Sequence, residues 1–261
     1  MDIQEIDLGN TVVRACLQDS TRLVVGFENG AGKAAQGGDA WAQGIARYAG
    51  WDGLHIMPKT LNWYQASDLW DYFHLAGKTG FFEGYESVVT YGSSMGGFAA
   101  MAFAKLIGAQ RVVAIQPRST LRWTLPWRSE QSDNMVYNRV GPHADAVDGL
   151  TPEMDVQVFA DPFFARDWNH AKRVPRATLY RVPLVKHNVP RVLKEIGILS
   201  EVARRAIDGR LEPSWFREQM RGRGRSVHYQ FCLEKALSRR QPEGAVIKHG
   251  IRQLGPNPKT K

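Results

Sequence analysis

A serine in a glycine-flanked turn constrains the fold of this chain more than any other sequence feature. Ser94 is the central residue of Gly92–Gly96, which fits the pattern G-x-S-x-G. Residues 88–91 are β-branched or aromatic and predict a strand, whereas the small residues of 96–105 predict a helix that packs closely on a sheet. So sharp a reversal strains the backbone of its central residue and leaves room only for glycine on either side.

This turn gives Ser94 the surroundings of a nucleophile. The strained backbone lifts the hydroxyl away from the main chain, and the amide of Met95 lies at the positive end of the following helix. That amide can therefore stabilise an oxyanion that forms beside Ser94. The alternative is a serine in an ordinary glycine-rich turn. The strand before the motif and the helix after it favour the nucleophile.

The rest of the chain predicts an α/β fold. Residues 3–8, 11–17 and 22–27 have strand-like patterns, and the turns between them predict an opening antiparallel meander. From residue 54 onward, strands and helices alternate, which predicts a mostly parallel sheet with helices on both faces. The further strands are expected at 54–57, 111–115, 156–160 and 178–182, and the further helices at 39–49, 66–77, 164–173 and 190–206.

Candidate catalytic residues follow three of the predicted parallel strands. In such sheets, functional side chains gather at the carboxyl ends of the strands, where Ser94, Asp161 and His187 are expected. A serine hydroxyl needs a histidine to accept its proton, and a carboxylate must orient that histidine. We therefore predict a catalytic triad of these three residues.

Alternatives exist for the acid and for the base. Asp155 precedes its strand and so lies at the wrong edge, whereas Asp167, inside the next predicted helix, is a second choice for the acid. The other histidines considered are each in a less suitable place than His187, within a helix, in the irregular segment or near the C-terminus: His170, His143, His228 and His249.

The turn at 92–97 and the order Ser94, Asp161, His187 resemble the α/β-hydrolase superfamily over about residues 1–206. The resemblance implies that fold, a nucleophile elbow at Ser94, and cleavage of esters, thioesters or amides. It also implies a second oxyanion donor after the third strand, from the amide of Phe27 or Glu28. The His-Gly-Gly motif found there in many lipases and esterases is missing from this chain.

Residues 117–150 form an irregular segment of turn residues, aromatic residues and arginines, in the place where the superfamily carries its lids. Trp123, Trp127, Arg122 and Arg128 are our candidates for substrate binding, because an apolar or ring-stacking group and an anionic group would suit them. An acylated, sugar-like small molecule is one such substrate. An ordinary surface excursion is the alternative.

The excess of positive charge belongs to the C-terminal segment. The chain carries a net charge of +8, and residues 204–261 hold 14 Lys and Arg against five Asp and Glu. We expect residues 207–261 to form a basic helical extension that includes a hairpin of helices at 227–240 and 243–254. The second helix is weakly similar to a tetratricopeptide-type unit. Such a hairpin must pack on the hydrolase domain or on a protein partner, and we do not expect it to bind nucleic acid.

Composition narrows the remaining possibilities. The N-terminus is acidic and lacks an apolar segment, no stretch is long enough to span a membrane, and Cys16 and Cys232 suggest neither a disulfide framework nor a metal site. We expect a cytoplasmic serine acyl hydrolase without cofactor or metal. An acyltransferase that uses the same triad is one alternative, and a non-catalytic docking module built on a hydrolase fold is the other.

Overall fold

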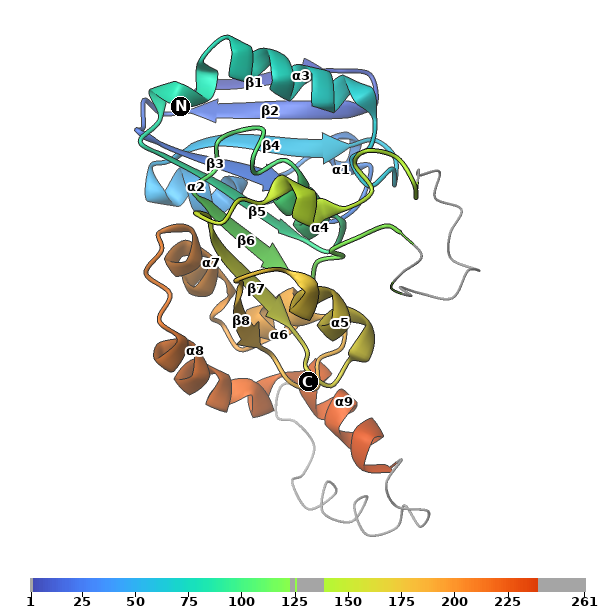
Figure 1. The fold of residues 1–261 in the computed structure, drawn as a ribbon. Coiled ribbons are helices and arrows are strands. Elements are labelled where there is room, and N and C mark those ends of the chain that lie inside the picture. The colour runs from blue at the N-terminus through green and yellow to red at the C-terminus, as the bar shows by residue number, and fades with distance from the viewer. Residues whose placement is uncertain (1, 123–124, 126–138, 239–261) are drawn as a thin grey trace.

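A computed structural model describes residues 2–122, 125 and 139–238 of the chain. Its centre is one eight-stranded sheet with the strand order β1-β2-β4-β3-β5-β6-β7-β8 (Figure 1). The strands are β1 (Asp2–Asp7), β2 (Thr11–Leu17), β3 (Arg22–Phe27), β4 (Asp52–Pro58), β5 (Ser87–Ser93), β6 (Arg111–Ile115), β7 (Asp155–Ala160) and β8 (Thr178–Arg181). The pairs β1–β2 and β2–β4 are antiparallel, and every other pair is parallel.

The expected antiparallel meander is wrong for its third strand. β3 does not pair with β2, because β4 lies between them, antiparallel to β2 and parallel to β3. The carboxylate of Asp52, the first residue of β4, accepts hydrogen bonds from the amides of Gln18 (2.6 Å) and Ser20 (3.2 Å). The turn after β2 is thus fastened to β4, and the chain passes beyond β4 before β3 begins.

Helices cover both faces of the sheet (Figure 1). The core on one face includes residues of α3 (Ser67–Lys78), α4 (Met95–Ala102), the 3₁₀ helix η3 (Ala146–Gly149) and α5 (Ala165–Arg173). The core on the other face includes residues of α2 (Gln43–Ala49), α6 (Val189–Glu195), α7 (Leu199–Ile207), α8 (Pro213–Gln219), η4 (Met220–Arg225) and α9 (Val227–Ser238). The short helices α1 (Lys33–Gln36) and η1 (Phe81–Gly84) complete the set that is described.

The single helix expected at 190–206 is divided into α6 and α7. Gly197 lies between them with a φ of 80°, in the left-handed region that suits glycine and ends helices. The break lets both short helices place apolar side chains, among them Val192 and Val202, in the same core.

The described part of the C-terminal extension packs on the central sheet. The ring of Phe216 in α8 meets those of Phe159 and Tyr180 edge to face, and the Tyr180 hydroxyl donates to the Leu211 carbonyl at 2.6 Å. Tyr229 and Cys232 of α9 are buried. The first helix of the expected hairpin corresponds to α9, and the second lies outside the described residues.

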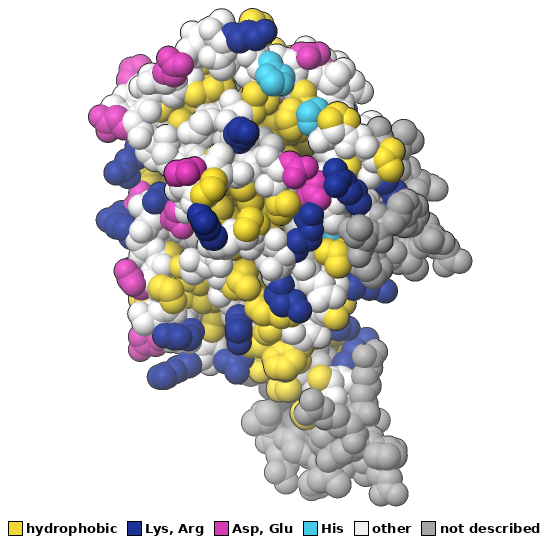
Figure 2. All heavy atoms as spheres, viewed as in Figure 1, with side chains coloured by type: hydrophobic (Ala, Val, Ile, Leu, Met, Phe, Trp, Pro, Cys, Tyr) yellow, Lys and Arg dark blue, Asp and Glu magenta, His cyan; other side chains and the backbone are white. Residues whose placement is uncertain are grey.

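Positive charge remains on the outer surface of this extension. Figure 2 shows Lys and Arg side chains gathered around apolar ones at the end of the molecule that α8 and α9 occupy. Arg217, Arg221 and Arg225 are exposed there, consistent with a solvated basic surface. Across the stretches of chain that the structure describes, none of the helices has the length and apolar character needed to cross a membrane.

Candidate active site

Ser94 occupies the predicted sharp turn between β5 and α4. Its backbone has φ 55° and ψ −114°, a strained conformation for a residue with a side chain. A Cβ atom on Gly92 would collide with the Gly96 carbonyl oxygen, and one on Gly96 would collide with the Phe27 carbonyl oxygen. Both flanking glycines are therefore sterically required, as the sequence predicted. The Ser94 amide donates to the Ile115 carbonyl at 2.9 Å, which fixes the turn to the end of β6.

Ser94 and His187 lie within hydrogen-bonding distance of each other. His187 lies in the loop between β8 and α6, at the carboxyl edge of the sheet, and its Nε2 is 2.8 Å from the Ser94 Oγ. The side chain of His187 is 18% exposed, so the ring is largely buried but still reaches the surface. A histidine nitrogen in this place can accept the proton of the serine hydroxyl.

The carboxylate that contacts His187 belongs to Asp167 and not to Asp161. Asp167 Oδ2 is 2.8 Å from His187 Nδ1, and the Asp167 side chain is fully buried. Asp167 is the third residue of α5, in the first turn of that helix. This acid was our second choice, and the geometry corrects the predicted constellation to Ser94, His187 and Asp167.

Asp161 is fully engaged elsewhere. Its Oδ1 accepts from the amides of Phe163 (2.9 Å) and Leu184 (3.0 Å), and its Oδ2 from those of Val185 (2.7 Å) and Lys186 (2.6 Å). A carboxylate has about four lone-pair sites, so these four amides saturate it. Asp161 does follow β7 at the expected edge of the sheet. Its oxygens bind backbone amides, three of them in the loop between β8 and α6 (residues 182–188, the histidine loop), so no oxygen is left to accept from the imidazole.

Two further residues hold the histidine loop, and sequence reasoning assigned neither of them a role. Gln116, just after β6, donates from Nε2 to the His187 carbonyl at 3.2 Å and accepts at Oε1 from the Val189 amide at 2.8 Å. His228 of α9 donates from Nε2 to the Val185 carbonyl at 3.0 Å. The sequence did offer a signal for each residue. Gln116 directly follows a predicted parallel strand, where functional side chains gather, and His228 lies in the C-terminal segment that was expected to pack on the domain or on a partner.

Of the three amides expected to bind an oxyanion, Met95 is the one in a suitable place. It is the first residue of α4, where backbone N–H groups have no intrahelical acceptor. The Glu28 amide instead donates to the Ile56 carbonyl at 3.1 Å, and Phe27 is the last residue of β3, paired with strands on both sides. Phe27 is thus part of the sheet, Glu28 directly follows it, and the carbonyl oxygens of both lie where a side chain on Gly96 would be.

Of the four predicted substrate-binding residues, Arg122 lies within the described part of the chain. Trp123, Trp127 and Arg128 lie outside the described residues. The Arg122 side chain is 49% exposed, with a guanidinium nitrogen 4.0 Å from the Asp145 carboxylate. Asp145 is buried and forms its closer ion pair with Arg173 of α5. This ion pair anchors residues 139–150, the later described part of the irregular segment, to α5.

Two buried histidines lie apart from this constellation. Burial lowers the pKa of His55 to about 4, and its Nδ1 is 3.0 Å from the Trp41 carbonyl. Burial and the charge of nearby Arg118 lower the pKa of His170 to about 3. The Nδ1 of His170 accepts from the Ser119 amide at 3.1 Å. Both rings are therefore neutral near pH 7.

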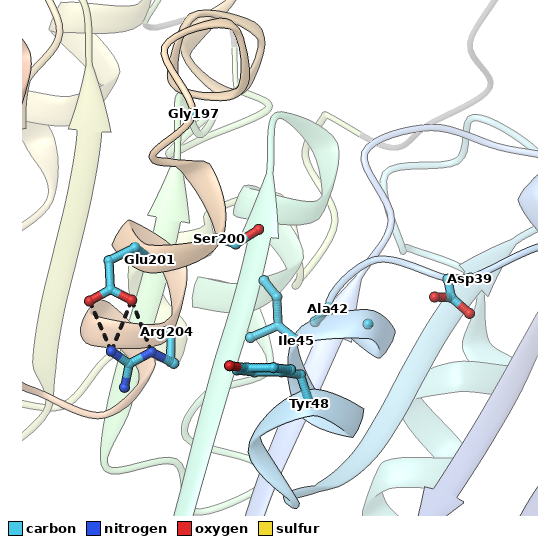
Figure 3. Close-up of a pocket in the computed structure, with 9 residues that line it drawn as sticks. Asp39, Ala42, Ile45, Tyr48, Gly197, Ser200, Glu201 and Arg204 are labelled. Atoms are coloured by element: carbon cyan, nitrogen blue, oxygen red, sulfur yellow. Dashed lines mark hydrogen bonds and ion pairs between the residues drawn. The ribbon is translucent and has the colours of Figure 1, made fainter. Parts of the chain in front are cut away.

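A surface cavity of about 560 Å³ between α2 and α7 is separate from Ser94. Figure 3 shows Ile45 and Tyr48 of α2 facing Ser200 and Arg204 of α7, with Arg204 paired to Glu201. None of its lining residues belongs to the Ser94, His187 and Asp167 constellation.

Comparison with known proteins supports the architecture. No protein-family model matches the chain, and no curated protein sequence matches it. Solved structures do match. An arylesterase structure is 13% identical with a TM-score of 0.52, covering 84% of this chain and 85% of that one. A mutant form of an esterase is 16% identical with a TM-score of 0.51, covering 84% of each chain.

An esterase/lipase from an uncultured bacterium gives a similar result, with 12% identity, a TM-score of 0.51 and coverage of 84% of this chain and 85% of that one. At such identities the likeness concerns the fold. No match supports the tetratricopeptide-like resemblance of the C-terminal segment. The strand order, the helices on both faces and these structural neighbours together show that the chain has the α/β-hydrolase fold.

Proposed function

We propose that the protein is a serine acyl hydrolase that cleaves a carboxylic ester or thioester through an acyl-enzyme on Ser94. The observation that carries this proposal is the continuous hydrogen-bonded chain from Ser94 Oγ through His187 to Asp167, with both contacts at 2.8 Å. A serine, a histidine and a buried carboxylate in this order are the arrangement that activates a hydroxyl for acyl transfer.

Each residue has a defined part in the reaction. His187 Nε2 removes the proton from Ser94 as its Oγ attacks the substrate carbonyl, and later returns that proton to the leaving alcohol or thiol. Asp167 accepts the Nδ1 proton, which leaves Nε2 free to act as the base, and it stabilises the imidazolium that forms. The Met95 amide stabilises the oxyanion. A water molecule, activated by His187, then releases the acyl group.

Full burial of the Asp167 side chain supports the proposal electrostatically. A carboxylate withdrawn from water interacts strongly with a positive charge beside it, and that charge develops on His187 in the transition state. The strained backbone of Ser94 adds support, because strain of this kind is retained where the surrounding structure enforces it for function. The structural neighbours include an arylesterase and an esterase, which agrees with a small-molecule ester as substrate.

Hydrolysis of short aryl esters tests the proposal. The wild type should release the aryl alcohol with saturation kinetics, and Ser94→Ala should reduce kcat by about 10⁶-fold, the loss typical of a missing serine nucleophile. Unfolding in urea should show nearly the same stability for both proteins, because the Ser94 hydroxyl is not a core contact. Equal turnover by the wild type and a folded Ser94→Ala variant would refute the assignment of Ser94 as nucleophile.

A further inference from the structure

The loop that carries His187 has an unusual backbone. Leu184 (φ 59°) and Lys186 (φ 52°) both adopt left-handed conformations, although neither is glycine. Each such residue is strained relative to the right-handed form, because its Cβ atom lies too close to the following carbonyl oxygen. A loop with two of them needs compensating contacts, or it relaxes to another shape and moves His187.

The carboxylate of Asp161 supplies those contacts. The amides of three successive residues, Leu184, Val185 and Lys186, converge on it at 2.6–3.0 Å. Alternating backbone conformations direct consecutive N–H groups to one point and create a concave anion-binding site, which a side-chain carboxylate fills here. The Asp161 side chain is buried, so water cannot replace it easily.

Asp161 also contacts the turn that leads to the other partner of His187. Its own turn leads into α5, with the Phe163 amide bound to Oδ1 and the Phe164 amide donating to the Asp161 carbonyl at 3.2 Å. Asp167 lies in the first turn of that helix. One carboxylate therefore fastens both the loop with the histidine and the entry to the helix with the acid.

From this geometry we infer that Asp161 is a positioning residue of the proposed hydrolase, which sets the distances of His187 to Ser94 and Asp167 without contacting His187 itself. The inference rests on the proposed function for its kinetic consequence. The geometric consequence, the hydrogen bond between His187 and Asp167, can be measured without any substrate.

The test compares Asp161→Asn with Asp52→Asn. Asp52 is also a buried aspartate that accepts two backbone amides, but it lies at the start of β4, at the opposite edge of the sheet from Ser94. In Asp161→Asn the NH₂ group faces two backbone amides, because the amides bind both carboxylate oxygens. In Asp52→Asn the remaining oxygen can still accept from both amides, and the NH₂ group faces the Tyr85 hydroxyl. Both variants replace the charged acceptor by a neutral one, so both are expected to lose stability. Stability measured in urea shows whether the two losses are comparable.

Kinetics and proton NMR distinguish a positioning role of Asp161 from a contribution to stability alone. For Asp161→Asn we expect kcat to fall about 10–100-fold with little change in KM, because small displacements of catalytic groups slow the reaction. We also expect the downfield signal of the His187 Nδ1 proton to shift or disappear. Asp52→Asn should keep kcat, KM and that signal.

Two outcomes would overturn the inference. If Asp161→Asn kept the kcat and the Nδ1 signal of the wild type, Asp161 would contribute to stability alone. If it reduced kcat as severely as Asp167→Asn, with the same change in the pH profile, Asp161 would be the catalytic acid. An inactive wild type would refute the proposed function instead, and the Nδ1 signal would still decide whether Asp161 positions His187.

Discussion

The two edges of the parallel sheet each have a buried aspartate that holds a neighbouring turn through backbone amides. At the amino edge, Asp52 binds the amides of Gln18 and Ser20 and the hydroxyl of Tyr85. At the carboxyl edge, Asp161 binds four amides, three of them in the loop that carries His187. The local interaction is the same, and what differs is the segment that it holds.

The segment that each aspartate holds determines the effect that we expect from its loss. The turn at Asp52 directs the chain from β2 past β4, so its loss affects folding. The loop at Asp161 contains a residue whose position within less than an ångström decides the rate of the proposed reaction. A buried carboxylate at the carboxyl edge is therefore not a catalytic acid merely because of where it lies.

The largest contrast is expected from Asp167→Asn. Loss of the carboxylate at His187 Nδ1 should reduce kcat by roughly 10³–10⁴-fold, because the imidazole loses both its tautomer control and its charge stabilisation. Asp52→Asn should leave kcat nearly unchanged. Steady-state hydrolysis of an aryl ester measures both variants. A mild effect of Asp167→Asn would contradict the assigned acid.

A smaller effect is expected at Gln116. Its side chain bridges the His187 carbonyl and the Val189 amide, so Gln116→Met removes two hydrogen bonds of the histidine loop. We expect a loss in kcat of about tenfold, since the contacts through Asp161 remain. Gln157→Met is the matched control, because Gln157 is also buried but bonds to Asp155 and Ala206. Equal kinetic losses in both variants would mean that Gln116 has no specific influence on His187.

The two core histidines should affect stability and not catalysis. Folding lowers the pKa of His55 to about 4 and of His170 to about 3, so below the unfolded value near 6.5 the unfolded chain binds more protons than the native state. The free energy of unfolding should therefore fall as pH decreases below about 6.5, by up to about 1.4 kcal/mol per pH unit for each histidine.

Urea unfolding at pH 7, 6 and 5 measures this slope. His55→Gln and His170→Gln should each flatten it, because glutamine does not titrate, and the double variant should flatten it further. An unchanged slope in the double variant would show that these histidines do not control stability below pH 6.5.

Much of the fold could be predicted from local sequence, because each parallel strand is a short apolar run with its own turn signals. The order of the strands could not. With β3 beyond β4, Asp52 binds the turn after β2, a contact between segments more than 30 residues apart that no local pattern reveals. The break between α6 and α7 had a local signal in Gly197.

In the candidate site, too, local sequence predicted the positions of residues along the chain but not the contacts between distant segments. The placement of Ser94 and His187 at the carboxyl ends of β5 and β8 follows from position along the chain, and the structure brings their side chains together. The choice between Asp161 and Asp167 depends on which oxygens remain after the backbone amides are satisfied. The four amides that saturate Asp161 come from Phe163 and from residues 184–186, about 20 residues further along the chain. Spacing along the sequence does not reveal these contacts, and it therefore favoured the aspartate nearer to the strand.

Covalent labelling by a fluorophosphonate tests the central claim most directly. The reagent phosphonylates a serine that a neighbouring base activates, so the intact mass of the folded wild type should increase by one adduct. Peptide mass spectrometry should place that adduct on Ser94, and Ser94→Ala should not react. An unmodified wild type, or an adduct on another residue, would contradict a Ser94 nucleophile activated by His187 and Asp167.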